Sequence, residues 1–345
     1  MRVRRKTTAT VAVTIAGIVA ATGLTGAGTA APQAPIQAAL ISDVGRFNDK
    51  SFNQSQLEGL VLAKKRLGVK ILPLESKSSA DYIPNLTTAV RRNSDLIISA
   101  GFLLANDTAK MVKRFPTRQF AITDYTVHAP PFANAKGKPL YKNITGLTYA
   151  AHQSGCLVGY LAALMTKKQG GKQVIGAVGG IKIPPVDIWI AGYRFCAKLA
   201  NPKITVLVGY SQDFVVADKC KVVAEDLIAQ GAQVLFQVAG GCGLGTLKAA
   251  DEAGIWGIGV DKDQYNDAKR VLTSGVKRVD TGVYLAIKAV STGAPFGGGD
   301  INFDLENGGM DVGKINPAVP KAFIAKMNVL KQKIIGGKVK PPTGL

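Results

Sequence analysis

Short apolar runs alternate with helical patterns along the chain from about residue 37 onward. Runs such as AALIS (38–42), DLIISA (95–100) and QFAIT (119–123) are largely apolar, and segments with helical spacing of apolar residues separate them. A strand that is buried on both faces is apolar along its length, and each return crossing between parallel strands needs a helix. The pattern therefore predicts an α/β fold built on parallel sheets.

The alternation starts again after a long apolar helix that we predict over residues 152–166. Strand-like runs follow at VIGAVGG (174–180), VLFQVAGG (234–241) and IWGIGVD (255–261), with helical segments between them. Two similar sets predict two doubly wound, parallel-sheet lobes rather than a short-period repeat. Neither set is complete before the last quarter of the chain, so we expect more than one crossing between lobes, as in hinge-bending binding proteins.

The expected boundaries follow from this order. Lobe 1 comprises residues 38–148 plus about 271–297, and lobe 2 comprises residues 149–270 plus about 298–345. Residues 1–31 are excluded from both, because a basic start (MRVRRK), an apolar stretch and the small residues GTAAP together indicate a cleavable export signal. An uncleaved anchor is the alternative. No cysteine lies near the cleavage zone, so we expect an exported protein, periplasmic or at the cell surface, without a lipid anchor.

A formal net charge of +20 raises the question of a nucleic-acid partner. Lysine and arginine are scattered along the chain rather than gathered into one stripe with aromatic residues, so we do not expect nucleic-acid binding. A basic surface that associates with anionic membrane or cell wall fits better. The four cysteines and two histidines show no metal-ligand spacing, which predicts neither metal nor cofactor. One or two disulfides are expected, with three pairings possible.

Polar and aromatic residues follow the predicted strands of the first lobe. In open α/β sheets ligands bind beyond the carboxyl ends of the strands. Asp43 follows the first strand and Asp124 the fourth, and carboxylates suit the N–H edge of a purine. Phe52 opens a helix and offers a stacking face. Ser51 is either the cap of that helix or part of the site.

Polar and aromatic residues also follow the predicted strands of the second lobe. AGGCGLGT (239–246) joins a strand to a helix but lacks the glycine spacing of a phosphate-binding loop. Asp261 ends a strand and can accept hydrogen bonds from vicinal ribose hydroxyls, and Lys277 can complete a polar clamp. Trp189 and Phe214 follow strands, where each is either a core residue or one face of a sandwich around a flat ring.

Four segments in this order and spacing resemble the basic membrane protein family. They are NDKSFNQS (48–55), VLFQVAGGCGLG (234–245), IGVDKDQY (258–265) and VLTSGVKR (271–278). The family's members are purine-nucleoside-binding components of ABC transporters with the type I periplasmic-binding fold. The resemblance extends from about Ala38 to the C-terminus and implies an ABC permease and ATPase as partners.

The resemblance also implies roles for individual residues. It assigns base stacking to Phe52, Trp189 and Phe214, and polar contacts with the base to Asp43, Asn53 and Asp124. It assigns contacts with the ribose to Gly241, Asp261 and Lys277. The chain departs from the family where Trp189 replaces a phenylalanine and Cys242 a small hydroxyl residue, and where the lipid-anchoring cysteine is absent.

We therefore expect an exported nucleoside-binding protein and not an enzyme. The chain has no HExxH or GxSxG motif, and its histidines do not suit a nucleophile–base pair. Two alternatives stay open at this stage. One is a nucleoside hydrolase or phosphorylase, for which Asp43 and Asp124 are a formal carboxylate pair. The other is a secreted nucleoside receptor or sensor that binds the same ligand without transport.

Overall fold

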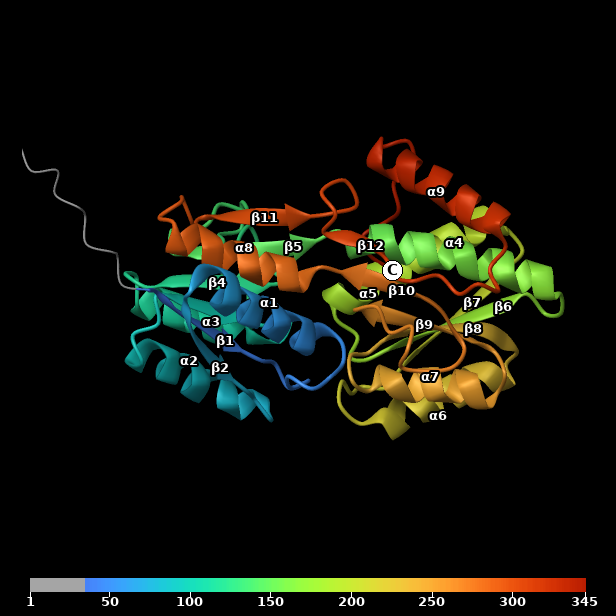
Figure 1. The fold of residues 1–345 in the computed structure, drawn as a ribbon, viewed down its shortest axis with the longest axis horizontal. Coiled ribbons are helices and arrows are strands. Elements are labelled where there is room, and N and C mark those ends of the chain that lie inside the picture. The colour runs from blue at the N-terminus through green and yellow to red at the C-terminus, as the bar shows by residue number, and fades with distance from the viewer. Residues whose placement is uncertain (1–34) are drawn as a thin grey trace, which may run out of the picture. The chain divides into compact units, whose positions relative to one another are not determined.

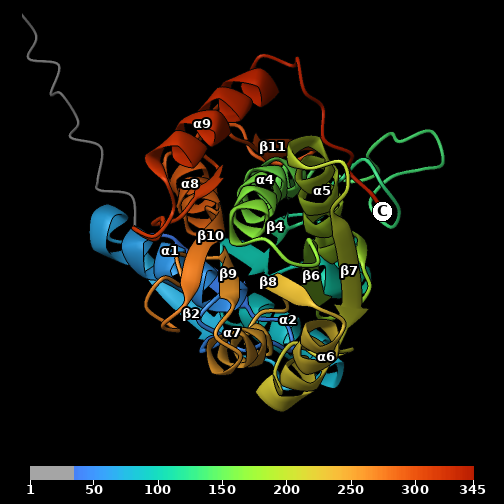
Figure 2. The ribbon, with the colours of Figure 1, turned by 90° about the vertical axis from the view of Figure 1, so that its right-hand side faces the viewer.

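Aliphatic runs that are buried on both faces form the central strands of two parallel sheets. In the computed structural model, which describes residues 35–345, all four residues of β3 (Leu96–Ser99) and all six of β6 (Val174–Gly179) are buried. Helices cover both faces of such strands, and Figure 2 shows this for the second sheet: α4 and α5 lie on one side, α6 and α7 on the other. The expected doubly wound α/β fold is confirmed.

The first sheet is entirely parallel, with strand order β11-β5-β4-β3-β1-β2. Its other strands are β1 (Gln37–Ile41), β2 (Lys70–Leu74), β4 (Gln119–Thr123), β5 (Ile144–Tyr149) and β11 (Gly299–Phe303). The helices of this lobe are α1 (Phe52–Leu67), α2 (Tyr82–Arg91), α3 (Ala105–Arg114) and α8 (Val279–Ser291), with short 3-10 turns at Ser79–Asp81 and Phe102–Leu104.

The second sheet has the order β12-β10-β9-β8-β6-β7, and only β12 runs antiparallel to its neighbour. Its other strands are β7 (Thr205–Tyr210), β8 (Ala232–Val238), β9 (Trp256–Asp261), β10 (Val271–Lys277) and β12 (Met310–Val312). The helices are α4 (Ala151–Gln169), α5 (Pro184–Ala200), α6 (Ala217–Ala229), α7 (Gly243–Glu252) and α9 (Lys321–Ile335).

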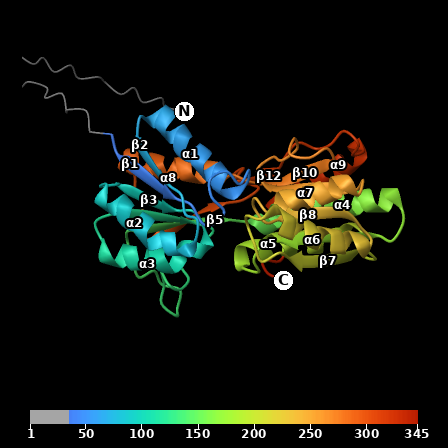
Figure 3. The same cartoon turned by 90° about the horizontal axis from the view of Figure 1, so that it is seen from below.

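The chain crosses between the lobes three times, after β5, after β10 and after β11 (Figures 1 and 3). The crossings lie side by side: the N–H of Ala150 donates to the carbonyl of Phe303 at 2.8 Å, and that of Arg278 to the carbonyl of Gly309 at 2.9 Å. The rings of Tyr149 and Phe303 stack 4.7 Å apart between centroids. Three adjacent connections form a narrow hinge region between the lobes.

The expected lobe boundaries need correction at two strands. Residues 271–277 were expected in lobe 1, but they form β10 and pair with β9 in the second sheet. Residues 299–303 were expected in lobe 2, but they form β11 and pair with β5 in the first sheet. Strand sequences carry no local signal for their partner, because pairing joins segments far apart in the chain. Helix α8, between them, packs on α1 in lobe 1 as expected.

Glycines bring the backbones of α4 and α5 into direct contact. A Cβ at Gly155 would lie 2.3 Å from the carbonyl oxygen of Trp189, and one at Gly159 would lie 2.2 Å from that of Tyr193. The same two helices are joined by the disulfide Cys156–Cys196. A second disulfide, Cys220–Cys242, joins α6 to the start of α7. The sequence did not determine which cysteines form disulfides. In the structure all four cysteines are in these two bonds.

The expected export signal, residues 1–31, lies outside the described residues. Among residues 35–345, no helix has the length and apolar character needed to cross a membrane.

Candidate functional site

The turn before α1 is organised by Asp49. Its carboxylate accepts hydrogen bonds from the backbone N–H groups of Ser51, Asn53 and Gln54, at 2.8–3.0 Å. These bonds satisfy amides that the first turn of a helix leaves unpaired. Ser51 does occupy the N-cap position of α1, one of the two roles expected for it, but its side chain makes no capping hydrogen bond. Its hydroxyl instead donates to Oδ2 of Asp261 at 2.8 Å, from one lobe to the other.

Asp43 lies at the end of β1 and is almost fully buried. Its Oδ1 accepts hydrogen bonds from the backbone N–H of Gly45 at 2.8 Å and from Nδ2 of Asn53 at 2.7 Å. Burial raises the pKa of Asp43 to about 7, although these two bonds favour the charged form, and the nearby carboxylates of Asp49 and Asp124 add to the increase. This carboxyl group therefore changes charge near neutral pH.

Lys277, at the end of β10, joins two carboxylates from opposite lobes. Its Nζ lies 2.6 Å from Oδ2 of Asp124 and 3.4 Å from Oδ1 of Asp261, and all three side chains are at least nine-tenths buried. Burial alone would lower the pKa of Lys277, but the attraction of Asp124 and Asp261 outweighs it and raises that pKa. The lysine is therefore charged in this site.

Both carboxylates of this ionic cluster sit on unusual backbone. Asp124 has φ 57° and Asp261 has φ 63°. These values lie in the left-handed region, which residues other than glycine adopt at a cost of about 1–2 kcal/mol. Each lies directly at or after the carboxyl end of a strand. Strain of this kind persists where the surrounding structure holds a residue for function. Oδ1 of Asp261 is also buried without a hydrogen-bond donor.

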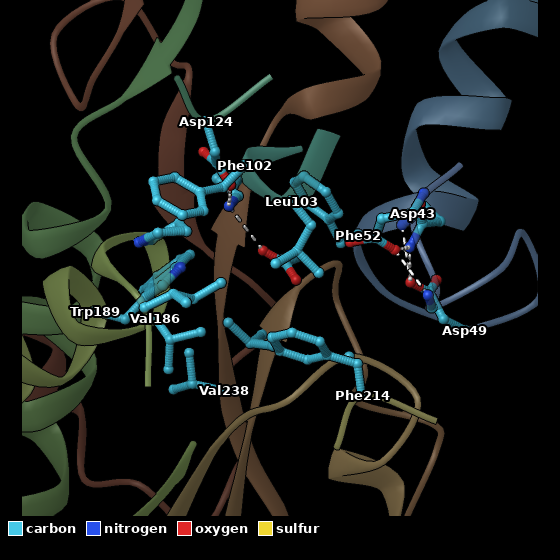
Figure 4. A pocket seen from close by; sticks show the side chains of 18 residues that line it. Asp43, Asp49, Phe52, Phe102, Leu103, Asp124, Val186, Trp189, Phe214 and Val238 are labelled. Atoms are coloured by element: carbon cyan, nitrogen blue, oxygen red, sulfur yellow. Dashed lines mark hydrogen bonds and ion pairs between the residues drawn. The ribbon is translucent and has the colours of Figure 1, made fainter. Parts of the chain in front are cut away.

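Aromatic side chains from both lobes complete the walls of a cavity of about 570 Å³, counting the part open to solvent. Phe52 comes from lobe 1, and Trp189 and Phe214 come from lobe 2; Figure 4 shows them around one space together with Phe102. Phe214 rests on Gly180, where a Cβ would lie 2.3 Å from its ring. Trp189 is 99% buried and packs edge-on against Phe236, so it also belongs to the core of lobe 2.

The cavity brings together eight of the nine residues that the sequence singled out. They are Asp43, Phe52, Asn53, Asp124, Trp189, Phe214, Asp261 and Lys277. Gly241 does not line it; its neighbour Gly240 does, and a Cβ at Gly241 would instead meet Asp49 at 3.5 Å. The positive φ of Gly240, 55°, turns the loop here and brings Gly240 rather than Gly241 to the cavity wall.

Sequence reasoning missed Phe102 and Leu103. They lie in the 3-10 turn just after β3 and line the cavity. The strand-end rule that found Asp43 and Asp124 applies equally to β3 and could have found them. The intervening Gly101 has φ 113°, and a Cβ there would lie 2.9 Å from the ring of Phe52.

Comparison with known proteins places this arrangement in a family. The family model described as ABC transporter substrate-binding protein PnrA-like matches residues 36–343. The chain belongs to this family. Its members bind a small ligand outside the cytoplasm and work with permease and ATPase partners.

Individual relatives and a solved structure agree with this assignment. The ABC transporter nucleoside-binding protein BmpA of Lactococcus lactis is 31% identical over 89% of each chain. The CD4+ T-cell-stimulating antigen of Listeria monocytogenes is 34% identical over 88% of this chain and 87% of that one. The crystal structure of an ABC transporter solute-binding protein from Aeropyrum pernix superposes with a TM-score of 0.79 at 27% identity, covering 89% of this chain and 94% of that one.

Proposed function

We propose that this protein captures a purine nucleoside in the cavity between its lobes and delivers it to an ABC permease and ATPase for uptake. Three features of the cavity support this: flat aromatic walls, a carboxyl–amide pair at one end, and an ionic cluster at the other. A nucleoside has the same order of parts, with a flat base that carries N–H groups and a sugar that carries hydroxyls.

The base would lie between the rings of Phe52 and Phe214, with Trp189 behind it. Asp43 and Asn53 are the polar groups at this end, and both are already oriented by hydrogen bonds to each other and to Gly45. An ionised Asp43 accepts hydrogen bonds from purine N–H groups, and Asn53 can both donate and accept. Pre-oriented side chains of this kind lose little entropy when the ligand binds.

The observation that carries the proposal is Oδ1 of Asp261, which is buried and accepts no hydrogen bond although it forms a long ion pair with Lys277. A buried acceptor without a donor costs free energy, and its nearest cation, Lys277, is at 3.4 Å. Two vicinal ribose hydroxyls would supply the missing donors. Because Lys277 bonds Asp124 as well, we place Asp124 with the sugar rather than with the base, to which the sequence interpretation assigned it.

The experiment is calorimetry of the purified protein with guanosine, inosine and adenosine, with the free bases and ribose as controls. We expect binding of at least one nucleoside and far weaker heats from the controls. The 2′-deoxynucleoside should bind about 10–100-fold more weakly, because it leaves Asp261 with one donor fewer. Absence of binding for every nucleoside contradicts the proposal.

A matched variant tests the role of Asp261. Asp261→Asn keeps the shape of the side chain but replaces one acceptor oxygen with a donor. We expect this variant to lose most of the discrimination between ribose and 2′-deoxyribose, whereas Asp263→Asn, two residues away and outside the cavity, should retain it. If both variants discriminated equally between ribose and 2′-deoxyribose, Asp261 would not be the residue that recognises the ribose.

The hydrolytic alternative makes a different prediction from the same geometry. Asp124 is bonded to Lys277 and Asp43 to Asn53 and Gly45, and Figure 4 shows the two aspartates on different sides of the aromatic residues. They are not arranged to share a proton between them. We therefore expect chromatography to recover the nucleoside intact after prolonged incubation, with and without phosphate, and release of free base would favour an enzyme.

A further inference from the structure

A second cavity adjoins the first at its ionic end. It measures about 990 Å³, counting the part open to solvent, and shares Phe102, Asp124 and Pro185 with the first cavity. Beyond these shared residues its walls include Tyr125, Tyr149 and Ile188, from both lobes and the hinge. Because Asp124 is bonded to Lys277, this space begins next to the cluster to which we assign the sugar.

The walls of the second cavity are largely apolar, and three of their hydroxyl groups already have partners, whereas the hydroxyl of Tyr149 is buried without one. The hydroxyl of Tyr125 donates to the carbonyl of Pro130, and that of Thr126 donates to Asp300. The hydroxyl of Thr148 donates to Asn302. The ring of Tyr125 also packs 5.1 Å from that of Phe102, between centroids. Such walls favour an apolar occupant over one that needs many hydrogen bonds.

Charge excludes an anionic occupant. Two carboxyl groups, of Asp124 and Asp261, face one ammonium group, that of Lys277, at the junction between the cavities, so an anion there has more acceptors than donors around it. The residues of the described chain that line the second cavity include no lysine, arginine or histidine. A phosphate group there would meet a carboxylate and would lose its water without compensation. A nucleoside 5′-phosphate therefore does not suit this space.

We infer that the protein accepts nucleosides whose sugar carries a neutral, apolar substituent, such as a thioether at the 5′ carbon, and that the second cavity holds this substituent. The inference rests on the proposed function, since it places the sugar at Asp261 and Lys277. Burial of a benzylthio group against these walls should tighten binding about tenfold or more, from the apolar area removed from water.

The test is a calorimetric series on the native protein with adenosine, 5′-benzylthio-5′-deoxyadenosine and adenosine 5′-monophosphate. The inosine series serves equally if inosine is the better parent. We expect the benzylthio compound to bind at least tenfold more tightly than the parent nucleoside, and the monophosphate at least a hundredfold more weakly. If the parent binds and the benzylthio compound binds no better, the inference fails while the proposed function stands. If neither these compounds nor guanosine and inosine bind, the proposed function itself fails.

A variant that fills the second cavity localises the effect. Ala129 lines this cavity and lies in the long loop after β4, so Ala129→Phe should occupy the space of the substituent. We expect the variant to bind the parent within about twofold of the native protein and to lose the gain from the benzylthio group. Ala135→Phe, at an exposed position of the same loop, is the matched control and should keep that gain. An undiminished gain in Ala129→Phe would place the substituent elsewhere and overturn the inference.

Discussion

The two ends of the first cavity bury carboxylates in opposite ways. At the end proposed for the base (the base end), Asp43 and Asp49 come from lobe 1 alone and are held by backbone N–H groups and Asn53, and no cation among residues 35–345 forms an ion pair with them. At the end proposed for the sugar (the sugar end), Asp124 and Asp261 come from different lobes and are joined by Lys277. Burial raises the pKa of Asp43 to about 7 although its hydrogen bonds oppose the increase, whereas at Asp124 burial also raises the pKa but the attraction of Lys277 opposes it.

The difference shows which end depends on closure of the lobes. The base-end contacts exist within lobe 1, so an open form would keep them. The sugar-end contacts from Lys277 to Asp124 and from Ser51 to Asp261 join the two lobes, so they form only when the lobes come together. A ligand that satisfies Asp261 would thus bind and stabilise the closed form through the same residues.

The largest effect should come from removing the cation at the sugar end. Lys277→Met leaves Asp124 and Asp261 buried without their partner, and we expect the free energy of unfolding to fall by about 3–5 kcal/mol. Denaturant titration measures this. The double variant Lys277→Met with Asp124→Asn should recover part of the loss, because one of the two uncompensated charges is gone. A loss below about 1 kcal/mol for the single variant would contradict the assignment of a charged, buried cluster.

A comparable effect, dependent on pH, is expected at the base end. The pKa of Asp43 is about 7 in the folded protein and about 3.9 in the unfolded chain, so between these values the folded state holds a proton that the unfolded state has lost. The stabilising contribution is complete below pH 4 and disappears as the pH rises through 7. Its slope is up to about 1.4 kcal/mol per pH unit, about 4 kcal/mol in all.

Asp43→Asn should remove this slope, which unfolding titrations between pH 5 and 8 would measure. The exposed Asp218→Asn is the control and should leave the slope unchanged. The same ionisation bears on the proposed ligand: if ionised Asp43 accepts hydrogen bonds from the base, as we propose, nucleoside affinity should decrease below pH 7 in the native protein and not in Asp43→Asn. If the nucleoside affinity of both proteins did not change with pH, Asp43 would not take part in recognition of the base.

The smallest effect is expected outside the cavity. Glu58 of α1 pairs with Lys262, just after β9, and this contact joins the lobes as Lys277 does, but with both side chains partly exposed. Exposed pairs contribute about 0.2–1 kcal/mol. Glu58→Gln should therefore weaken nucleoside binding less than about fivefold, and the difference should vanish in 1 M salt. A larger, salt-independent loss would make closure depend on the surface rather than on the buried cluster.

Local patterns were enough to predict the elements and most of the singled-out residues that line the cavity. The predicted helix 152–166 lies within α4, which extends a few residues further at its C-terminal end, and every strand that the sequence predicts is present. These features depend on the spacing of apolar residues within about 5–20 positions, which the sequence displays directly. The cavity residues at strand ends were found for a related reason: the carboxyl ends of parallel strands meet at one edge, wherever each strand lies in the order.

What the sequence by itself determined, then, is the α/β class, the two sets of strands and the strand-end positions of Asp43, Asp124 and Asp261. Only the tertiary structure decided the lobe of β10 and β11, the pairing of the cysteines, the bond from Ser51 to Asp261 and the cavity beyond Asp124. The physical reason is range. Hydrophobic periodicity is a property of neighbours in the chain, whereas these contacts join segments up to about two hundred residues apart, whose meeting depends on how both lobes pack and close.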